Sequence, residues 1–188
     1  MHILPLSVKC TLFVNLAAAE SCGQDRAVCM PWPCSRIGHA DGSGDDILIP
    51  DPGYANYFGQ AQMAQVNVVP VPLYEKHGFR MRAADVEAAI TPRTRALLLN
   101  SPSNPTGAII DPVELAAIAD VARRHDLWVI SDEVYRAFVY DDNTRCLSIA
   151  SMPGMKERTI VIDSFSKTFA MTGWRSAARS GRNRSSTG

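Results

Sequence analysis

The sequence predicts an α/β protein with a three-layer α-β-α architecture, in which helices cover both faces of a mostly parallel sheet. Short apolar runs, such as residues 47–49 and 95–99, are almost uninterrupted, as in strands that are buried on both faces. Longer segments with a helical spacing of apolar residues lie between these runs. This alternation of strand and helix patterns is typical of a parallel sheet.

The predicted elements lie between residues 44 and 175. The strands are expected at residues 47–49, 66–71, 95–100, 127–130 and 159–162, and the helices at residues 54–65, 83–90 and 112 to about 125. Proline- and glycine-rich turns separate them, for example at residues 50–53 and 101–107. Asp111 followed by Pro112 is a typical helix start, with the cap residue directly before a proline.

Composition indicates a globular protein and excludes several function classes. Of the 188 residues, 46% are hydrophobic and 20% are charged, and the formal net charge is zero. A neutral chain gives no reason to expect nucleic acid or an anionic membrane as a partner. No apolar run is long enough to span a bilayer. The five cysteines have no metal-like spacing, so no metal site is expected.

The two ends differ in texture from the central part. Residues 1–43 lack sustained periodicity and are an atypical N-terminal segment. The start has some likeness to a signal peptide, but Lys9 interrupts its apolar stretch and a basic leading region is missing. We therefore expect a cytoplasmic protein. Residues 176–188 consist largely of serine, arginine, glycine and alanine, which predicts a disordered tail.

Polar clusters follow three of the predicted strands. Asn104 follows the strand at 95–100, residues 132–135 follow the next strand, and residues 164–167 follow the last. In open parallel sheets, ligands bind beyond the carboxyl ends of the strands. The three clusters are therefore expected to form one site.

The last cluster has residues that could bind an aldehyde and a phosphate. A lysine at a strand end, among residues that exclude water, can lose its proton and form a Schiff base with a carbonyl carbon, and Lys167 is in that position. Ser164, Ser166 and Arg175 supply two hydroxyl groups and a guanidinium, which suit a phosphate.

The two other clusters complete the chemistry of one cofactor. Asp132 follows an apolar strand, so its partly desolvated carboxylate would attract a cation such as a pyridinium nitrogen. Tyr135 and Asn104 could both donate hydrogen bonds to a phenolate oxygen. A reactive lysine, a phosphate anchor, a pyridinium carboxylate and phenolate donors together describe a site for pyridoxal 5'-phosphate.

The motifs in these clusters resemble those of a known family. NSPSNPTG at 100–107, SDEVY at 131–135 and SFSKTFAMTGWR at 164–175 look like motifs of the class I/II aminotransferases of the aspartate aminotransferase superfamily. DPGY at 51–54 resembles an upstream segment of the same family. The resemblance covers about residues 44–175.

The resemblance implies a role for each candidate residue. Lys167 would hold pyridoxal 5'-phosphate as a Schiff base and move the α-proton of the substrate. The other expected contacts surround the ring and phosphate of the cofactor: Asp132 at the ring nitrogen, Tyr135 and Asn104 at the phenolic oxygen, Tyr54 over the ring face, Ser164 and Arg175 at the phosphate, and Ser166 as a weaker phosphate contact.

The function that the resemblance implies is exchange of an amino group between an amino acid and a 2-oxo acid, in a parent enzyme that is a homodimer. Two alternatives stay open. The cofactor residues do not define the fate of the substrate carbanion, so a C–S β-lyase is possible on the same scaffold. The chain could also be a non-catalytic remnant, because several parts typical of the family are missing.

The missing parts lie at both ends. The glycine- and alanine-rich helix start expected before residue 44 is absent, and so is the small domain expected after residue 175. Back-translation of residues 176–188 with GC-rich codons permits a family-like continuation in a neighbouring frame. We therefore expect residues 44–175 to be part of the large cofactor-binding domain, with frame-shifted segments at 1–43 and 176–188. Sequencing of the locus tests this expectation.

Overall fold

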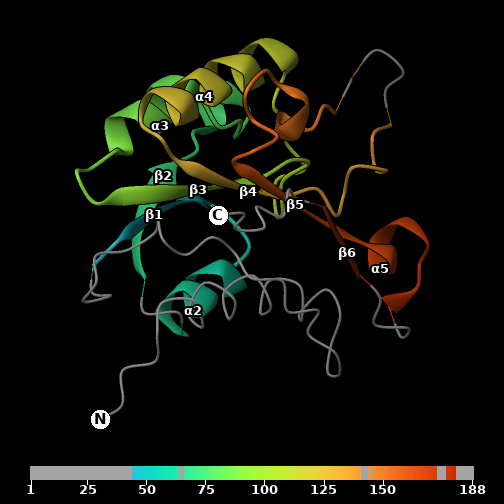
Figure 1. Cartoon of the computed structure of the whole chain (residues 1–188). Helices are drawn as coiled ribbons and strands as arrows, with labels where there is room; N and C mark the ends of the chain where they lie inside the picture. Colours follow the sequence, from blue (N-terminus) through green and yellow to red (C-terminus); the bar gives the residue numbers. More distant parts are fainter. Residues whose placement is uncertain (1–43, 64–65, 141–143, 145, 173–176, 181–188) are drawn as a thin grey trace, which may run out of the picture.

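The structure is a computed structural model that describes residues 44–63, 66–140, 144, 146–172 and 177–180. Within these residues, six strands form one sheet in the order β2-β1-β3-β4-β5-β6 (Figure 1). Strands β1 to β5 are parallel, and β6 pairs antiparallel with β5. The strands are β1 (Asp46–Asp51), β2 (Asn67–Pro72), β3 (Thr94–Asn100), β4 (Trp128–Asp132), β5 (Thr159–Ser164) and β6 (Ala177–Ser180).

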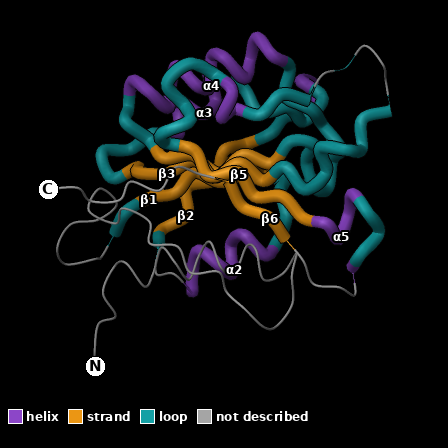
Figure 2. Tube along the Cα trace, turned by 45° about the vertical axis from the view of Figure 1, so that its right-hand side comes forward, coloured by secondary structure: helices purple, strands orange, loops and turns teal. Residues whose placement is uncertain are grey.

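Helices cover both faces of the sheet. Helices α3 and α4 lie side by side on one face and α2 lies on the opposite face, as both ribbon views show (Figures 1 and 2). The predicted three-layer α-β-α architecture with a mostly parallel sheet is therefore confirmed. The helices are α2 (Asn56–Met63), α3 (Ala83–Ala89), α4 (Pro112–Arg124) and α5 (Phe165–Thr168), with short 3-10 helices η2 (Glu75–His77) and η3 (Ile149–Ser151).

The buried strand residues alternate between two hydrophobic clusters. Leu48, Leu97 and Leu99 belong to the cluster under α3 and α4, whereas Ile49 and Leu98 belong to the cluster on the α2 side. Successive side chains of a strand point to opposite sides of the sheet, and helices cover both sides, so β1 and β3 are buried and largely apolar on both faces. This explains the uninterrupted apolar runs in the sequence.

Helix α4 begins as the sequence predicts. The side chain of Asp111 accepts hydrogen bonds from the backbone N–H groups of Val113, at 3.1 Å, and Glu114, at 2.9 Å. Pro112 occupies the first helical position, where a missing N–H costs no hydrogen bond. The local sequence therefore sets the point at which the chain enters this helix.

A polar network connects the amino-terminal ends of three strands of the sheet. The side chain of Asp46, only 1% exposed, accepts hydrogen bonds from Asn67 Nδ2 at 2.8 Å and from Thr91 Oγ1 at 2.5 Å. Arg93 Nε lies 3.5 Å from Asp46 Oδ1. One carboxylate thus joins the starts of β1 and β2 to the loop that precedes β3.

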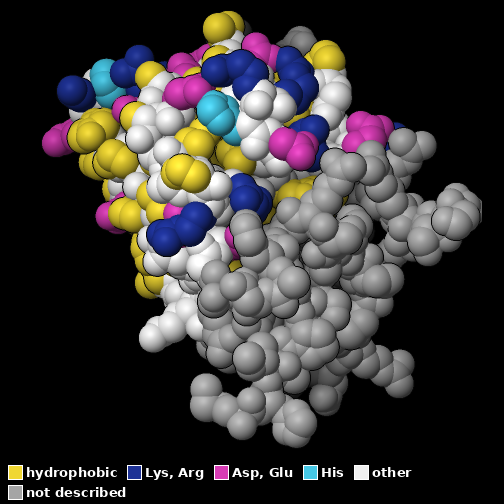
Figure 3. Space-filling model, turned by 60° about the vertical axis from the view of Figure 1, so that its left-hand side comes forward, with side chains coloured by type: hydrophobic (Ala, Val, Ile, Leu, Met, Phe, Trp, Pro, Cys, Tyr) yellow, Lys and Arg dark blue, Asp and Glu magenta, His cyan; other side chains and the backbone are white. Residues whose placement is uncertain are grey.

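The charged surface is mixed in sign. On the face shown in Figure 3, basic and acidic side chains alternate over the upper part of the molecule, where α3 and α4 lie. Glu87 of α3 makes an ion pair with Arg124 Nη2 and a hydrogen bond with His125 Nε2, both at 2.6 Å, which link α3 to the end of α4. Among the described residues, no helix combines the length and the apolar character that crossing a membrane requires.

The carboxyl-terminal part differs from the expectation at one point. We expected residues 176–188 to be disordered or frame-shifted, but residues 177–180 form β6. The backbone of this segment pairs antiparallel with the free edge of β5, a contact that composition alone does not predict. Residues 1–43 and 181–188, which the other expectations about the two ends concern, lie outside the described residues.

Candidate functional site

The loops that follow β3, β4 and β5 meet beyond the carboxyl-terminal ends of these adjacent strands. Asn104 follows β3, Tyr135 follows β4, and Lys167 lies in α5, which begins directly after β5. All three line one cavity of about 710 Å³. The structure therefore brings one residue from each predicted cluster to the same site.

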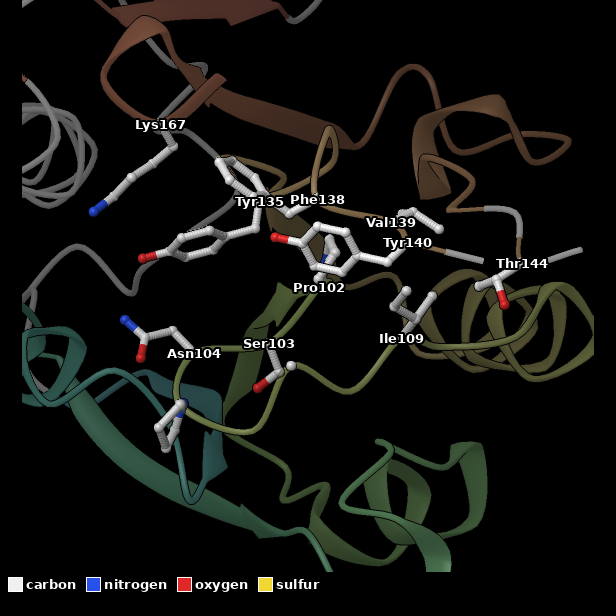
Figure 4. Close-up of a pocket in the computed structure, with 12 residues that line it drawn as sticks. Pro102, Ser103, Asn104, Ile109, Tyr135, Phe138, Val139, Tyr140, Thr144 and Lys167 are labelled. Atoms are coloured by element: carbon white, nitrogen blue, oxygen red, sulfur yellow. The ribbon is translucent and has the colours of Figure 1, made fainter. Parts of the chain in front are cut away.

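The polar end of this cavity has available hydrogen-bonding groups. Figure 4 shows the polar ends of Lys167, Tyr135 and Asn104 pointing into the same part of the cavity. Lys167 Nζ lies 5.6 Å from the centroid of the Tyr135 ring. Within the described part of the chain, the Tyr135 hydroxyl and the Asn104 side-chain amide have no hydrogen-bond partner. A ligand can therefore use both groups.

The other end of the cavity is mainly apolar. Ile109, Phe138, Val139 and Tyr140 line it (Figure 4). Tyr140 is 91% exposed, so its ring stands at the open side of the cavity. The cavity thus passes from polar groups near Lys167 to apolar side chains near the surface.

Asp132 ends β4 and is held by two donors. Its Oδ2 accepts a hydrogen bond from the Tyr57 hydroxyl at 2.5 Å, and its Oδ1 accepts one from the Val134 backbone N–H at 3.2 Å. Burial raises the pKa of Asp132 above its ordinary value, although these two hydrogen bonds act in the opposite direction. A desolvated carboxylate of this kind is stabilised by a cationic group such as a protonated ring nitrogen.

Tyr57 is a site residue that the sequence reasoning missed. It is 2% exposed and lies at the start of α2. Burial and, after it, the negative charge of Asp132 raise the pKa of Tyr57 well above its ordinary value, so the phenol remains a proton donor. A weak signal was present, because Tyr57 lies three positions after Tyr54, one helical turn further along a predicted helix.

Tyr54 is connected to Asp132 through Tyr57. The rings of Tyr54 and Tyr57 meet edge to face, with centroids 5.4 Å apart. The Tyr54 hydroxyl accepts a hydrogen bond from Asn56 Nδ2 at 2.8 Å. These contacts orient the Tyr54 ring, but its expected place over a cofactor ring stays a prediction.

Asp132 and Tyr54 are not among the residues that line the cavity, and Asn100 connects Asp132 to it. The Asn100 side chain donates a hydrogen bond to the backbone carbonyl of Asp132 at 3.2 Å and accepts one from the backbone N–H of Asn104 at 2.7 Å. Asn100 is also a residue that the sequence reasoning did not single out. Its position as the last residue of a strand, directly before the turn-rich segment, was the available signal.

The serines near Lys167 have structural contacts. Ser164, 2% exposed, caps α5 by accepting a hydrogen bond from the Ser166 backbone N–H at 3.1 Å. Ser166 is also buried, at 5% exposure. Their expected contacts with a phosphate stay predictions. Arg175, the expected second phosphate contact, lies outside the described residues.

The described donors and acceptors fit pyridoxal 5'-phosphate. An amine shares one cavity with two donors that have no partner among the described residues. Through Asn100, the backbone of Asn104 is joined to the backbone of Asp132, whose carboxyl group has a raised pKa. These are the groups that an aldehyde, a phenolic oxygen and a ring nitrogen require.

Comparison with known proteins decides the family. Residues 39–185 match the family described as aminotransferase class I and II. The chain belongs to this family. Pyridoxal 5'-phosphate is the cofactor of the family, and the aminotransferase resemblance predicted from the motifs is therefore confirmed.

Known aminotransferases are similar in sequence to the central part of the chain. Over 131 residues it is 50% identical to "Aromatic-amino-acid aminotransferase 2" of Thermococcus litoralis, a match that covers 70% of this chain and 33% of that protein. It is 49% identical over 132 residues to an aspartate aminotransferase of Pyrococcus abyssi, with 70% of this chain and 34% of that protein covered. The chain thus spans about a third of the length of these relatives.

Solved aminotransferase structures share the fold. The aromatic aminotransferase of Pyrococcus horikoshii superposes with a TM-score of 0.73 and 39% identity, covering 95% of this chain and 42% of that chain. N-Succinyldiaminopimelate aminotransferase of Mycobacterium tuberculosis superposes with a TM-score of 0.73 and 37% identity, covering 92% of this chain and 40% of that chain. These aminotransferases therefore have the three-layer α-β-α fold with a mostly parallel sheet that the sequence predicts.

Proposed function

We propose that this chain carries the cofactor-binding centre of an enzyme that transfers an amino group between an amino acid and a 2-oxo acid. One observation carries the proposal: the Lys167 amine shares a cavity with the available donors of Asn104 and Tyr135, at the sheet edge where Asp132 ends β4. The membership in the aminotransferase family supports the reaction type.

Each residue has a role that its surroundings support. Pyridoxal 5'-phosphate, when bound, supplies a reactive aldehyde and a ring that accepts negative charge from the substrate Cα. The Lys167 amine would hold that aldehyde carbon in the resting enzyme and, once the substrate amine has displaced it, would move the proton at the substrate Cα. The Asp132 carboxylate pairs with the ring nitrogen and keeps it protonated, because a buried carboxylate favours a cationic partner.

The remaining contacts orient the cofactor. The Tyr135 hydroxyl and the Asn104 amide donate to its phenolic oxygen, and Tyr54 stacks on its ring face. The resemblance assigns the phosphate to Ser164, Ser166 and Arg175, of which Arg175 lies outside the described residues. The family resemblance supports these assignments, and the available donors of Tyr135 and Asn104 support two of them directly.

The first experiment tests cofactor binding through Lys167. The purified chain is incubated with pyridoxal 5'-phosphate, and the absorbance band of the lysine-bound cofactor is recorded. We expect the band in the wild type and in Lys156→Ala, a matched variant of an exposed lysine outside the cavity, and no band in Lys167→Ala. A band that persists in Lys167→Ala would contradict the assignment of the lysine.

The second experiment identifies the reaction. Amino acid and 2-oxo acid are added to the cofactor-loaded chain, and products are analysed by mass spectrometry. Exchange of the amino group supports the proposal. Pyruvate and ammonia from a cysteine-type substrate indicate the C–S β-lyase instead, and absence of any band or product indicates a non-catalytic remnant.

We also propose a homodimeric parent enzyme with a cytoplasmic location. The family resemblance supports the homodimer. Size-exclusion chromatography with light scattering tests the first point, and fractionation of cells that express the chain tests the second.

A further inference from the structure

We infer that Asn100 is a positioning residue that fixes the cofactor contact Asn104 relative to the cofactor contact Asp132. The inference rests on the proposed function for the roles of these two residues. Its structural part rests on hydrogen bonds of the described chain alone. Asn100 does not line the cavity, so it acts through its two neighbours and not on the substrate.

The strand register places Asn100 beside Asp132. In the parallel pair of β3 and β4, Leu99 is opposite Ser131 and Asn100 is opposite Asp132, and both strands end there. The Asn100 side chain is buried, with 6% of the residue exposed. Its Nδ2 donates to the Asp132 carbonyl at 3.2 Å, and its Oδ1 accepts from the Asn104 backbone N–H at 2.7 Å.

These two hydrogen bonds allow only one orientation of the amide. The Asp132 carbonyl is an acceptor and the Asn104 N–H is a donor, so a flipped amide would lose both hydrogen bonds. A buried polar group that loses its hydrogen-bond partner destabilises the folded state. The Asn100 side chain therefore fixes the distance between the end of β4 and the loop that carries Asn104.

The other hydrogen bonds of the loop do not replace this connection. Ser103 N–H donates to the Ala108 carbonyl and Gly107 N–H donates to the Ser103 carbonyl, which closes the loop on itself. The Ser101 N–H also reaches the Asp132 carbonyl, at 3.4 Å, but Ser101 lies three residues before Asn104. Among the described residues, the hydrogen bond to Asn100 is the one that joins Asn104 itself to the sheet.

The first test needs no cofactor. Amide hydrogen exchange is measured on the full chain for the wild type, Asn100→Ala, Asn100→Asp and Thr159→Val. Thr159→Val is the matched control, since it removes a buried hydroxyl without a partner in β5, at the opposite end of the strand from Ser164. We expect exchange of the Asn104 amide to accelerate at least about tenfold in Asn100→Ala.

Asn100→Asp separates the two hydrogen bonds. An aspartate keeps an acceptor oxygen for the Asn104 N–H but loses the amide donor to the Asp132 carbonyl. Protection of the Asn104 amide should therefore largely persist in Asn100→Asp and be unchanged in Thr159→Val. Equal protection in the wild type and in Asn100→Ala would overturn the inference.

The second test uses the cofactor-loaded chain. The pH midpoint of the absorbance change of bound cofactor is measured for Asn100→Ala, Asn104→Ala and the double variant. A donor to the phenolic oxygen stabilises the deprotonated form, so its loss raises the midpoint, by about one pH unit for one hydrogen bond. We expect the double variant to shift no further than Asn104→Ala.

The outcomes separate the inference from the proposed function. Additive shifts, or an unshifted midpoint in Asn100→Ala, would show that Asn100 does not act through Asn104 and would overturn the inference while cofactor binding stands. A wild type without a cofactor band would overturn the proposed function and the functional part of the inference together. The exchange measurement would then still decide whether Asn100 holds the loop.

Discussion

The Tyr57 hydroxyl lies 2.5 Å from Oδ2 of Asp132 and joins helix α2 to the end of strand β4. Burial raises the pKa of Asp132, and the hydrogen bond from Tyr57 lowers it, so the two effects oppose each other at the carboxylate that we assign to the cofactor ring nitrogen. Tyr57 therefore helps to keep Asp132 ionised.

Replacement of Tyr57 by phenylalanine should destabilise the chain by about 1–3 kcal/mol at pH 7, because Asp132 loses a charge-assisted hydrogen bond. It should also raise the pKa of Asp132 further. A raised carboxyl pKa means that the folded state binds the proton more tightly, so the free energy of unfolding decreases as pH rises from about 3.8 through the folded-state pKa. The pH range over which the free energy of unfolding decreases should therefore extend to higher pH in Tyr57→Phe.

Urea denaturation across a pH series measures both effects. Tyr74→Phe is the control, since Tyr74 is 43% exposed and its ring contacts among the described residues are with its chain neighbours Lys76 and His77. An unchanged pH dependence in Tyr57→Phe would show that the hydroxyl does not influence the ionisation of Asp132.

Replacement of Asp46 by asparagine should destabilise the amino-terminal edge of the sheet by about 1–3 kcal/mol at neutral pH. Burial acts to raise the pKa of Asp46, but the hydrogen bonds from Thr91 and Asn67 and the charge of Arg93 outweigh it, and the pKa lies below its ordinary value. The stabilisation is therefore present above pH 3.8 and is lost as pH falls through the lower, folded-state pKa.

Acid titration of the free energy of unfolding checks this prediction. The wild type should lose more stability than Asp46→Asn as pH is lowered below 3.8. Asp85→Asn, a change in the first turn of α3, serves as the control and should follow the wild type. Parallel acid profiles of the wild type and Asp46→Asn would refute the role of the carboxylate.

Replacement of Ala170 by glycine should stabilise the chain by about 1 kcal/mol, because Ala170 has a φ of 53°, in the left-handed region that a residue with a Cβ atom adopts at a cost. The same substitution at the exposed helical position Ala88 should have the opposite sign and about the same size. Thermal unfolding of the two variants gives the comparison, and a loss of stability in Ala170→Gly would contradict the backbone argument.

Replacement of Asp111 by alanine should reduce stability by about 0.5–2 kcal/mol, since two backbone N–H groups at the start of α4 lose their acceptor. An asparagine side chain at the same position would still offer an acceptor oxygen, so the Asp111→Asn change should retain most of the capping. Circular dichroism during urea denaturation measures both variants. Equal losses in the two would indicate that charge near the helix start, and not the hydrogen bonds, matters.

The sequence predicted the architecture because strand and helix patterns depend on local periodicity. It also predicted that Asn104, Tyr135 and Lys167 would meet, since parallel strands bring their carboxyl ends to one edge. Tyr57 and Asn100 were not predicted because their partners are set by tertiary contacts. The hydroxyl of Tyr57 reaches from α2 to the end of β4, and one register among several places Asn100 opposite Asp132. Strand β6 was missed because its pairing depends on the free edge of β5 and not on its own composition.

The strands that carry the site, β3, β4 and β5, are neighbours both in the sheet and along the chain. Asn100, Asn104, Asp132, Tyr135 and Lys167 therefore belong to one uninterrupted stretch of sequence. A gene segment encoding residues 100–167 could be exchanged with that of another aminotransferase as a single cassette, which would transfer these five residues and the Asn100 connection together. Recombination between relatives would thus move the residues that line the Lys167 cavity as one unit, whereas Tyr54, Tyr57 and Arg175 would have to be supplied by the recipient chain.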